Sequence, residues 1–198
     1  IRWFDCTVTG MEAHAGPTPM ALRKDAMLAA TRIMQDVVAA AHRHPPHGRG
    51  TVGMVQVFPN SRNVIPGRVK FSIDLRNATD ALVDQMADEV KAFAAKVGQE
   101  HGVDVKIEMV SSYNAIQFHE NCVDAVGRAA KKLGYSNMPA VSGAGHDAVY
   151  MAKLAPAGMI FIPCKDGISH NEIEDAKPEH ITAGCNVLLH AMLERAGT

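Results

Sequence analysis

The chain of 198 residues is 47% apolar, which is enough to bury a core in one large domain or two small ones. Its 20 Lys and Arg residues balance 21 Asp and Glu residues, and no basic stripe with interleaved aromatic residues occurs, so we expect no nucleic-acid partner. No apolar run approaches the length of a membrane span and no basic-then-apolar leader precedes Ile1, so we expect a cytoplasmic protein with no membrane partner.

Hydrophobic periodicity predicts a small α+β domain in residues 1–115. The predicted elements are, in chain order, a strand over 2–8, a helix from 19 to about 44, a β-rich segment over 51–58, a strand over 69–75, a helix from Asp80 to Gly98 or Gly102, and a strand over 103–109. This β-α-β-β-α-β order is that of the ferredoxin-like sandwich, in which two helices cover one face of an antiparallel sheet.

From 116 to 198 the pattern is dominated by helices. We expect helices over 121–133, 146–154 and 178–195, a turn-rich stretch over 134–145, and one buried strand over 158–162. One strand is too little sheet for these helices, so this segment is predicted to be the end of a larger α/β layer whose other strands lie elsewhere. Because the chain also begins directly in a strand without an initiator methionine, we expect it to be a fragment.

The cysteines stand singly along the chain, without C-x-x-C spacing, at Cys6, Cys122, Cys164 and Cys185. Such spacing favours reduced thiols over a disulfide framework or a thiolate zinc site. We therefore expect all four to be small buried apolar residues.

The loop between the first strand and the first helix holds His14. Gly16, Pro17 and Pro19 restrict the backbone after it, and Thr18 is expected to cap a helix that Pro19 opens. An imidazole on so stiff a loop can be aimed at a ligand. The alternative is a surface histidine beside an ordinary capped helix start.

Asn63 and Arg76 flank the clearest predicted strand. If the loop before this strand is a tight connection, both side chains lie near the same end of the sheet, where a carboxamide and a planar guanidinium could grip a carboxylate. The alternatives are a turn asparagine and a solvated arginine on an edge strand.

Two further polar clusters lie in the second half of the chain. Residues 142–148 (SGAGHDA) are glycine-rich before a helix start, so backbone N–H groups near Gly145 and His146 could hold an anion, while Asp147 could instead cap the helix. His170 lies just beyond the predicted strand 158–162, and the ends of strands in open α/β sheets are where ligands and metals gather. The alternative is a hydrogen-bonded loop histidine.

Taken together and in order, these motifs resemble those of the metal-dependent hydantoinase/carbamoylase amidases. The matching segments are 13–20 (AHAGPTPM) with Arg23, Asp25 and Ala26, then 63–67 (NVIPG), 74–76 (DLR), 142–148 (SGAGHDA) and 167–172 (GISHNE). That family includes N-carbamoyl-L-amino-acid hydrolase, β-ureidopropionase and allantoate amidohydrolase, within the larger aminoacylase and metallo-carboxypeptidase group. The resemblance spans essentially the whole chain.

The resemblance implies a dimeric enzyme with two domains. One is a catalytic α/β domain that binds two divalent metals, such as zinc, manganese, cobalt or nickel; the other is an inserted ferredoxin-like lid that also dimerises. It implies hydrolysis of the carbamoyl C–N bond of N-carbamoyl-L-amino acids or of related ureido or allantoate substrates. Residues 1–115 correspond to the lid and 116–198 to the C-terminal part of the catalytic domain.

The resemblance also implies residue roles. His170 corresponds to a metal ligand, and His14 to the lid histidine that steadies the tetrahedral intermediate, in its own or the partner subunit's site. Asn63 and Arg76 correspond to the grip on the substrate carboxylate, and Gly145 with His146 to a further substrate contact.

The chain departs from the family pattern because it has no H-x-D motif and no Glu-Glu pair. A dinuclear site cannot be built from one histidine, since such metals take about four ligands each. We therefore expect these residues alone neither to hold metal tightly nor to turn over substrate. The alternatives are a non-catalytic dimerisation module, and a dipeptidase or deacylase of the same larger group.

Overall fold

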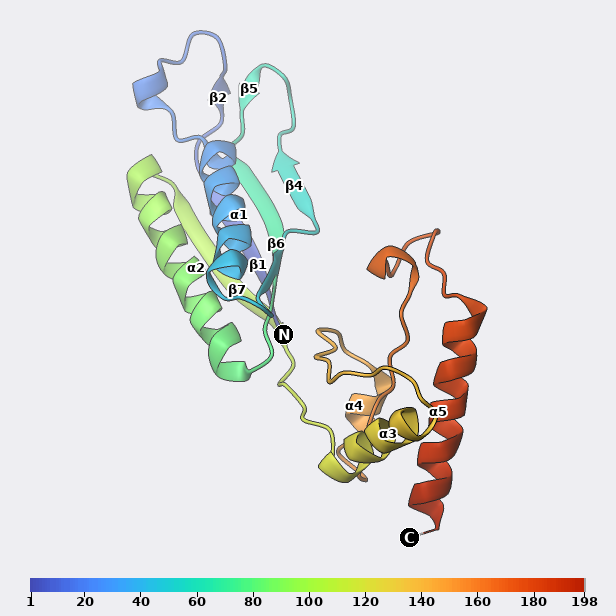
Figure 1. Cartoon of the computed structure of the whole chain (residues 1–198). Helices are drawn as coiled ribbons and strands as arrows, with labels where there is room; N and C mark the ends of the chain where they lie inside the picture. The colour runs from blue at the N-terminus through green and yellow to red at the C-terminus, as the bar shows by residue number, and fades with distance from the viewer. Residues whose placement is uncertain (198) are drawn as a thin grey trace. The chain divides into compact units, whose positions relative to one another are not determined.

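The structure is a computed structural model that describes residues 1–197. The chain divides into two compact units, the first being Ile1–Ala115 and the second beginning at Ile116 (Figure 1). Within residues 1–197, no helix combines the length and the apolar character that crossing a membrane requires.

The first unit is an antiparallel sheet with two helices on one face. Its strands are β1 (Arg2–Thr9), β3 (Arg49–Thr51), β4 (Val55–Phe58), β6 (Arg68–Arg76) and β7 (Asp104–Ser112). They are ordered β3-β6-β1-β7, and β4 also pairs with β6. The helices are α1 (Ala26–Arg43) and α2 (Asp80–His101), which lie side by side across the sheet (Figure 1). The predicted mixed α/β fold with a ferredoxin-like order is confirmed, with β3 and β4 replacing one predicted strand.

Strand alternation builds the core of this unit. Phe4 and Cys6 of β1 and Phe71 and Ile73 of β6 are at most 3% exposed and belong to one cluster with the apolar faces of α1 and α2. Because side chains alternate along a strand, the polar residues between them, Asp5 and Ser72, point to the other face. There Lys70 lies 2.8 Å from the Asp5 carboxylate.

The start of α1 differs from the prediction. Its N-cap is Asp25, whose side chain accepts hydrogen bonds from the N–H groups of Met27 and Leu28. Residues Met20–Leu22 form only a short 3-10 turn, η1. Thr18 does not cap a helix, because its hydroxyl donates to the main-chain carbonyl of His14 at 2.6 Å.

The second helix begins at Asp80, as predicted, and its N-cap is the residue before it. Thr79, rather than Asp80, accepts a hydrogen bond from the N–H of Leu82. The Asp80 carboxylate instead accepts one from the N–H of Ala115. The helix ends as expected at Gly102, whose φ of 60° is a left-handed conformation that glycine adopts without a Cβ clash.

The second unit is built mainly from helices. They are α3 (Glu120–Lys132), α4 (Asp147–Met151), the 3-10 turn η2 (Lys165–Gly167) and α5 (Pro178–Ala196). The three predicted α-helices are thus present. The predicted buried strand over 158–162 is wrong: this segment is half-exposed to exposed and is not part of a sheet. A strand needs a neighbour to complete its hydrogen-bond ladder, and no described strand of this unit provides one.

The four cysteines are free thiols. Only Cys6 is buried, whereas Cys122 and Cys164 are half-buried and Cys185 is exposed. The expectation of four buried cysteines is therefore correct only for Cys6. The other three lie in the second unit, whose buried cluster is small.

Candidate active site

A two-stranded arm carries His14 and Asn63. The arm consists of residues 10–25 and 58–67, whose short strands β2 (Ala13–His14) and β5 (Val64–Ile65) pair antiparallel, with His14 opposite Val64. The N–H of the next residue, Ala15, donates to the carbonyl of Asn63 at 2.8 Å. Figure 1 shows β2 and β5 at one end of the first unit. The arm therefore carries His14 at the end of β2 and Asn63 just before β5, on adjoining segments of the chain.

The base of the arm is held against the sheet and the start of α1 by main-chain contacts. The N–H of Gly10 donates to the carbonyl of Gly67 at 2.8 Å, and the N–H of Met11 donates to that of Lys24 at 2.9 Å. A Cβ on Gly10 would lie only 2.0 Å from the Lys24 oxygen, so this approach requires glycine.

The His14 ring has one nitrogen already engaged. Nδ1 accepts a hydrogen bond from the N–H of Gly16 at 3.0 Å. A ring nitrogen that accepts carries no proton, so in the neutral imidazole the proton is on Nε2, which is then a donor. Because the side chain is exposed, Nε2–H can donate to a ligand oxygen that gains negative charge during a reaction.

Asn63 is also exposed, and its side-chain oxygen accepts a hydrogen bond from the hydroxyl of Ser61 at 2.9 Å. This bond fixes which end of the amide is the acceptor, so the NH₂ group supplies the donors. Beside the Nε2–H of His14, the arm thus offers hydrogen-bond donors of the kind that bind a carboxylate or an oxyanion.

Arg76 lies at the other end of the sheet from Asn63. Asn63 precedes β6, which begins at Arg68, whereas Arg76 is the last residue of β6. The eight steps of this strand span about 26 Å at a rise of about 3.3 Å per residue. The prediction that Asn63 and Arg76 share one end is therefore wrong, because the loop enters β6 at the end opposite to the one where Arg76 leaves it.

The Arg76 guanidinium is paired with Asp74. Its Nε is 3.0 and 3.2 Å from the two carboxylate oxygens, and its terminal nitrogen is 2.7 Å from one of them. These hydrogen bonds raise the pKa of Arg76, outweighing the effect of partial burial. A ligand carboxylate that binds Arg76 would therefore share the guanidinium with Asp74 or displace it.

The glycine-rich segment of the second unit ends in a histidine cap. His146 precedes α4, and its Nδ1 accepts a hydrogen bond from the N–H of Ala148 at 3.1 Å. The expected alternative, capping by Asp147, is wrong. Gly145 has no atom within 4 Å of where its Cβ would lie, so the space beside it is open. One N–H of this helix start is thus occupied by His146 instead of an anion.

His170 lies on an exposed turn after η2, with a φ of 58°. Its N–H donates to the Glu174 carboxylate at 2.8 Å. Within residues 1–197, no three His, Cys, Asp or Glu side chains are grouped so that they could hold a metal ion. His170 alone does not fit a dinuclear centre, so the described residues do not form one.

Arg23 is a residue of the arm for which the sequence suggested no role. Its Nε and one terminal nitrogen donate to the carbonyl of Thr18 at 3.1 and 3.0 Å, and the same terminal nitrogen donates to Ala15 at 2.7 Å. The signal in the sequence is an arginine that closely follows a histidine, glycine and proline turn. Such a turn exposes main-chain carbonyls, which a guanidinium fork can bridge.

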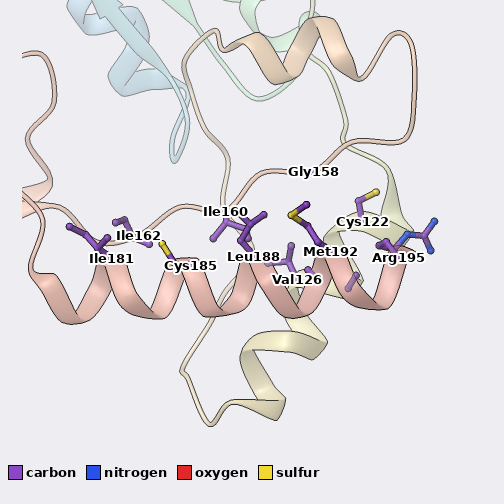
Figure 2. A pocket seen from close by; sticks show the side chains of 13 residues that line it. Cys122, Val126, Gly158, Ile160, Ile162, Ile181, Cys185, Leu188, Met192 and Arg195 are labelled. Carbon is purple, nitrogen blue, oxygen red and sulfur yellow. The ribbon is translucent and has the colours of Figure 1, made fainter. Parts of the chain in front are cut away.

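A cavity of about 490 Å³ runs along one side of α5 in the second unit (Figure 2). Its wall includes Cys122 and Val126 of α3, Ile160 and Ile162 of the extended segment, and Leu188 and Met192 of α5. Its described lining residues include no carboxylate and no histidine, which are the usual groups of acid-base catalysis, and apart from Cys122, Cys185 and Arg195 they are apolar or glycine.

The sequence of the chain matches a known protein family and several curated proteins. The model of the peptidase family M20/M25/M40 matches residues 9–194. An N-carbamoyl-L-amino-acid amidohydrolase of Rhizobium meliloti is 46% identical over 99% of this chain and 47% of its own length. An allantoate amidohydrolase of Bacillus subtilis is 32% identical over 98% of this chain and 47% of its own.

The fold of the chain also matches that of solved structures. The crystal structure of a hydantoinase/carbamoylase family amidase from Burkholderia multivorans superimposes with a TM-score of 0.94 and 52% identity, over 98% of this chain and 47% of that one. The chain spans about half the length of the curated relatives it matches.

Proposed function

Because the chain belongs to the peptidase family M20/M25/M40, we propose that it forms part of a metal-dependent amidohydrolase acting on N-carbamoyl-L-amino acids or related ureido compounds such as allantoate. The reaction adds water to the carbamoyl carbon, breaks its C–N bond to the amino acid, and releases the amino acid, carbon dioxide and ammonia. The observation that carries this proposal is the arm itself, whose adjoining segments expose two hydrogen-bond donors, the Nε2–H of His14 and the carboxamide of Asn63.

The first unit would act as a lid that presents these donors to the substrate. In this role His14 donates its Nε2 proton to the oxygen that becomes negative as water adds to the carbamoyl carbon. Asn63 and Arg76 bind the substrate carboxylate, the arginine by sharing or exchanging its pair with Asp74. Gly145 and His146 would supply a further substrate contact from the second unit.

The implied metals are not accommodated by the described residues, as shown above for His170. When bound, such ions supply a polarised carbonyl and a water of lowered pKa. We propose that His170 contributes one ligand and that the others come from polypeptide outside residues 1–197. The second unit would then be the C-terminal part of the catalytic domain.

The separation between the arm and Arg76 supports a dimeric site. A small substrate places its carboxylate within a few ångströms of its carbamoyl group, whereas the length of β6 is about 26 Å. His14 and Arg76 of the same chain therefore cannot contact one substrate molecule. We propose that two chains associate through the first unit, so that His14 and Asn63 of one chain complete a site that contains Arg76 of the other.

Mixing two variants that are each strongly impaired at substrate concentrations below the wild-type KM tests this arrangement. His14→Ala and Arg76→Ala chains, each joined to the remaining half that the relatives carry, are refolded together and assayed for metal-dependent ammonia release. In a mixed dimer, one site carries both substitutions and the other carries neither, so activity should return toward one quarter of the unmixed wild type, because half of the dimers are mixed and half of their sites are intact. No recovery, with mixed dimers shown by mass spectrometry, would contradict the two-chain site.

The substrate class is tested with the same assembled enzyme. N-carbamoyl, N-acetyl and dipeptide derivatives of one amino acid are compared at equal concentration. Preferred release of ammonia from the carbamoyl compound supports the proposal, whereas preferred cleavage of the acetyl or peptide bond would favour a deacylase or dipeptidase. The 198-residue chain alone should be inactive in all three assays.

A further inference from the structure

We propose that Arg23 is the positioning residue for His14: it holds the turn after the imidazole in the shape that fixes both the ring's proton and its direction. The inference rests on the proposed function of His14. Arg23 would not touch the substrate and would act only through the turn.

The guanidinium bridges two main-chain carbonyls of the turn. Its two nitrogens donate to the carbonyl of Thr18, and one of them also donates to that of Ala15. Thr18 in turn donates from its hydroxyl to the carbonyl of His14 at 2.6 Å. Arg23 is thus linked to His14 through Thr18, and its second acceptor, Ala15, is the residue bonded to His14.

This closed turn determines what the ring can do. Gly16 lies between the two carbonyls that Arg23 binds, and its N–H donates to His14 Nδ1. A Cβ on Gly16 would lie 3.4 Å from two atoms of the ring, which is ordinary van der Waals distance, so the imidazole lies directly beside this glycine. If the turn opens, the Gly16 N–H leaves Nδ1, and the ring is free to rotate and to carry its neutral proton on either nitrogen.

Arg23 can transmit rigidity because its own backbone is anchored. It lies between η1 and Asp25, the N-cap of α1, and the neighbouring Lys24 carbonyl accepts the N–H of Met11. The first residue of α1, Ala26, is fully buried in the core. The guanidinium therefore connects the turn after His14 to the start of α1, which is anchored in the core.

The bonding of Arg23 is that of a shape-holding residue. Within residues 1–197 its donors go to main-chain carbonyls and it makes no ion pair with a carboxylate. A lysine in its place has one nitrogen and can reach both carbonyls only from one point. The replacement Arg23→Lys should therefore retain part of the effect, and Arg23→Ala none.

Enzyme kinetics provide the first test, in the assembled enzyme described above. Arg23→Ala should lower kcat about tenfold to a hundredfold with KM within about twofold, and Arg23→Lys should lower it less. The matched control is Arg62→Ala, which removes an exposed arginine of the same arm and should leave both constants unchanged. A KM effect as large as the kcat effect, or an equal loss in the control, would overturn the proposal.

A double variant separates positioning from general damage. If Arg23 acts only through His14, His14→Ala with Arg23→Ala should be no slower than His14→Ala alone. A further loss in the double variant would show an independent structural effect and sink the proposal.

Nitrogen NMR of the 198-residue chain gives a readout that does not depend on activity. In the wild type, the His14 ring should show a protonated Nε2 and an unprotonated Nδ1 at a pH where it is neutral. In Arg23→Ala the two signals should move toward each other as the tautomers mix, with the sheet signals unchanged. If they do not move, Arg23 does not position the ring. If they move but His14→Ala leaves kcat unchanged, the positioning stands and the proposed role of His14 fails.

Discussion

At the scale of single residues, His14 and Arg76 differ in how far their hydrogen-bonding groups are already engaged within the protein. His14 has one ring nitrogen satisfied by its own loop and one left as a donor, whereas Arg76 already has a full carboxylate partner. The first is suited to a charge that appears only during the reaction. The second is suited to a charge that the substrate carries throughout, because an ion pair can be exchanged for a similar one.

Arg76→Ala should therefore act mainly on binding. Because the side chain is 28% exposed, the loss should be near the lower end of the range for charge pairs, about 2 kcal/mol or about thirtyfold in KM. Steady-state kinetics of the assembled enzyme measure this, with Arg49→Ala as control because Arg49 lies opposite Arg76 in the sheet. Equal increases of KM in both variants would point to damage at the sheet edge instead.

His14→Ala should act mainly on kcat, lowering it roughly 10²–10³-fold if Nε2–H stabilises the developing oxyanion. KM should change little, because the substrate carboxylate remains bound by other groups. Kinetics with an N-carbamoyl amino acid check this. A change in oligomeric state together with equal losses in kcat and KM would indicate a structural role for His14.

The cysteines should differ sharply in reactivity. Burial raises the pKa of the Cys6 thiol to about 12, so at pH 8 it has almost no thiolate and no access to reagent. Cys185 is exposed. Alkylation followed by mass spectrometry should label Cys185 rapidly and Cys6 only at the rate at which the first unit opens. Early labelling of Cys6 would contradict the packing of β1 against the helices.

At the scale of elements, α1 and α2 are joined by an ionic cluster at one end. Glu89 of α2 accepts from Arg43 at 3.0 Å and from Gln85 at 3.2 Å, and lies 2.9 Å from Nε2 of His44. Partial burial would raise the pKa of Glu89, but the hydrogen bonds from His44, Arg43 and Gln85 outweigh it and lower the pKa below its ordinary 4.5.

A lowered carboxyl pKa makes stability depend on pH in one direction. The ionised form is favoured by folding, so the stabilisation is present above pH 4.5 and is lost as the pH falls through the lower pKa of the folded state. Between pH 5 and pH 3 the wild type should lose more stability than Glu89→Gln, measured by urea unfolding followed through the fluorescence of Trp3. Glu108→Gln, an exposed residue of β7, is the control and should follow the wild type.

The elements also show what sequence can and cannot predict. The alternation in β1 and β6 reflects burial of one face, so these strands were predicted within a residue or so. The start of α1 was not, because Thr18-Pro19 and Asp25 both carry local signals for a helix start. The Thr18 hydroxyl instead donates to the carbonyl of His14, four residues earlier, within a turn that the sequence pattern does not predict.

The candidate site followed the same rule. His14 and Asn63 were each identified from their loops, but their closeness depends on two-residue strands that carry no periodicity. The predicted closeness of Asn63 and Arg76 is wrong because it requires a tight turn between them, whereas the whole of β6 separates them. The bonds of Arg23 go to main-chain carbonyls, and the sequence signals them only through an arginine placed shortly after a histidine, glycine and proline turn.

At the scale of the whole molecule, the two units differ in how much they bury. The first has a core shared by the sheet, α1 and α2, whereas the second buries a small cluster consisting mostly of alanines: Ala125, Ala129, Ala130, Val187 and Ala191. Since the burial of apolar surface is the main contribution to folding stability, the second unit should be much less stable than the first.

Unfolding of the 198-residue chain should therefore occur in two steps. Hydrogen exchange should be fast throughout α3 and α5 and slow in β1, β6 and the buried side of α1. The fluorescence of Trp3, the only tryptophan, reports the first unit and should change at a higher urea concentration than the first loss of helical circular dichroism. A single coincident transition would show that the units are stabilised together.

The length of β6 has a consequence for how such a protein can change. Side chains alternate along a strand, so inserting one residue between Arg68 and Arg76 would turn the guanidinium into the helix-covered layer. Inserting two would restore its side but shift it by about 7 Å. The distance from the arm to the guanidinium can therefore change only in steps of two residues if Arg76 is to stay on the same face of the sheet.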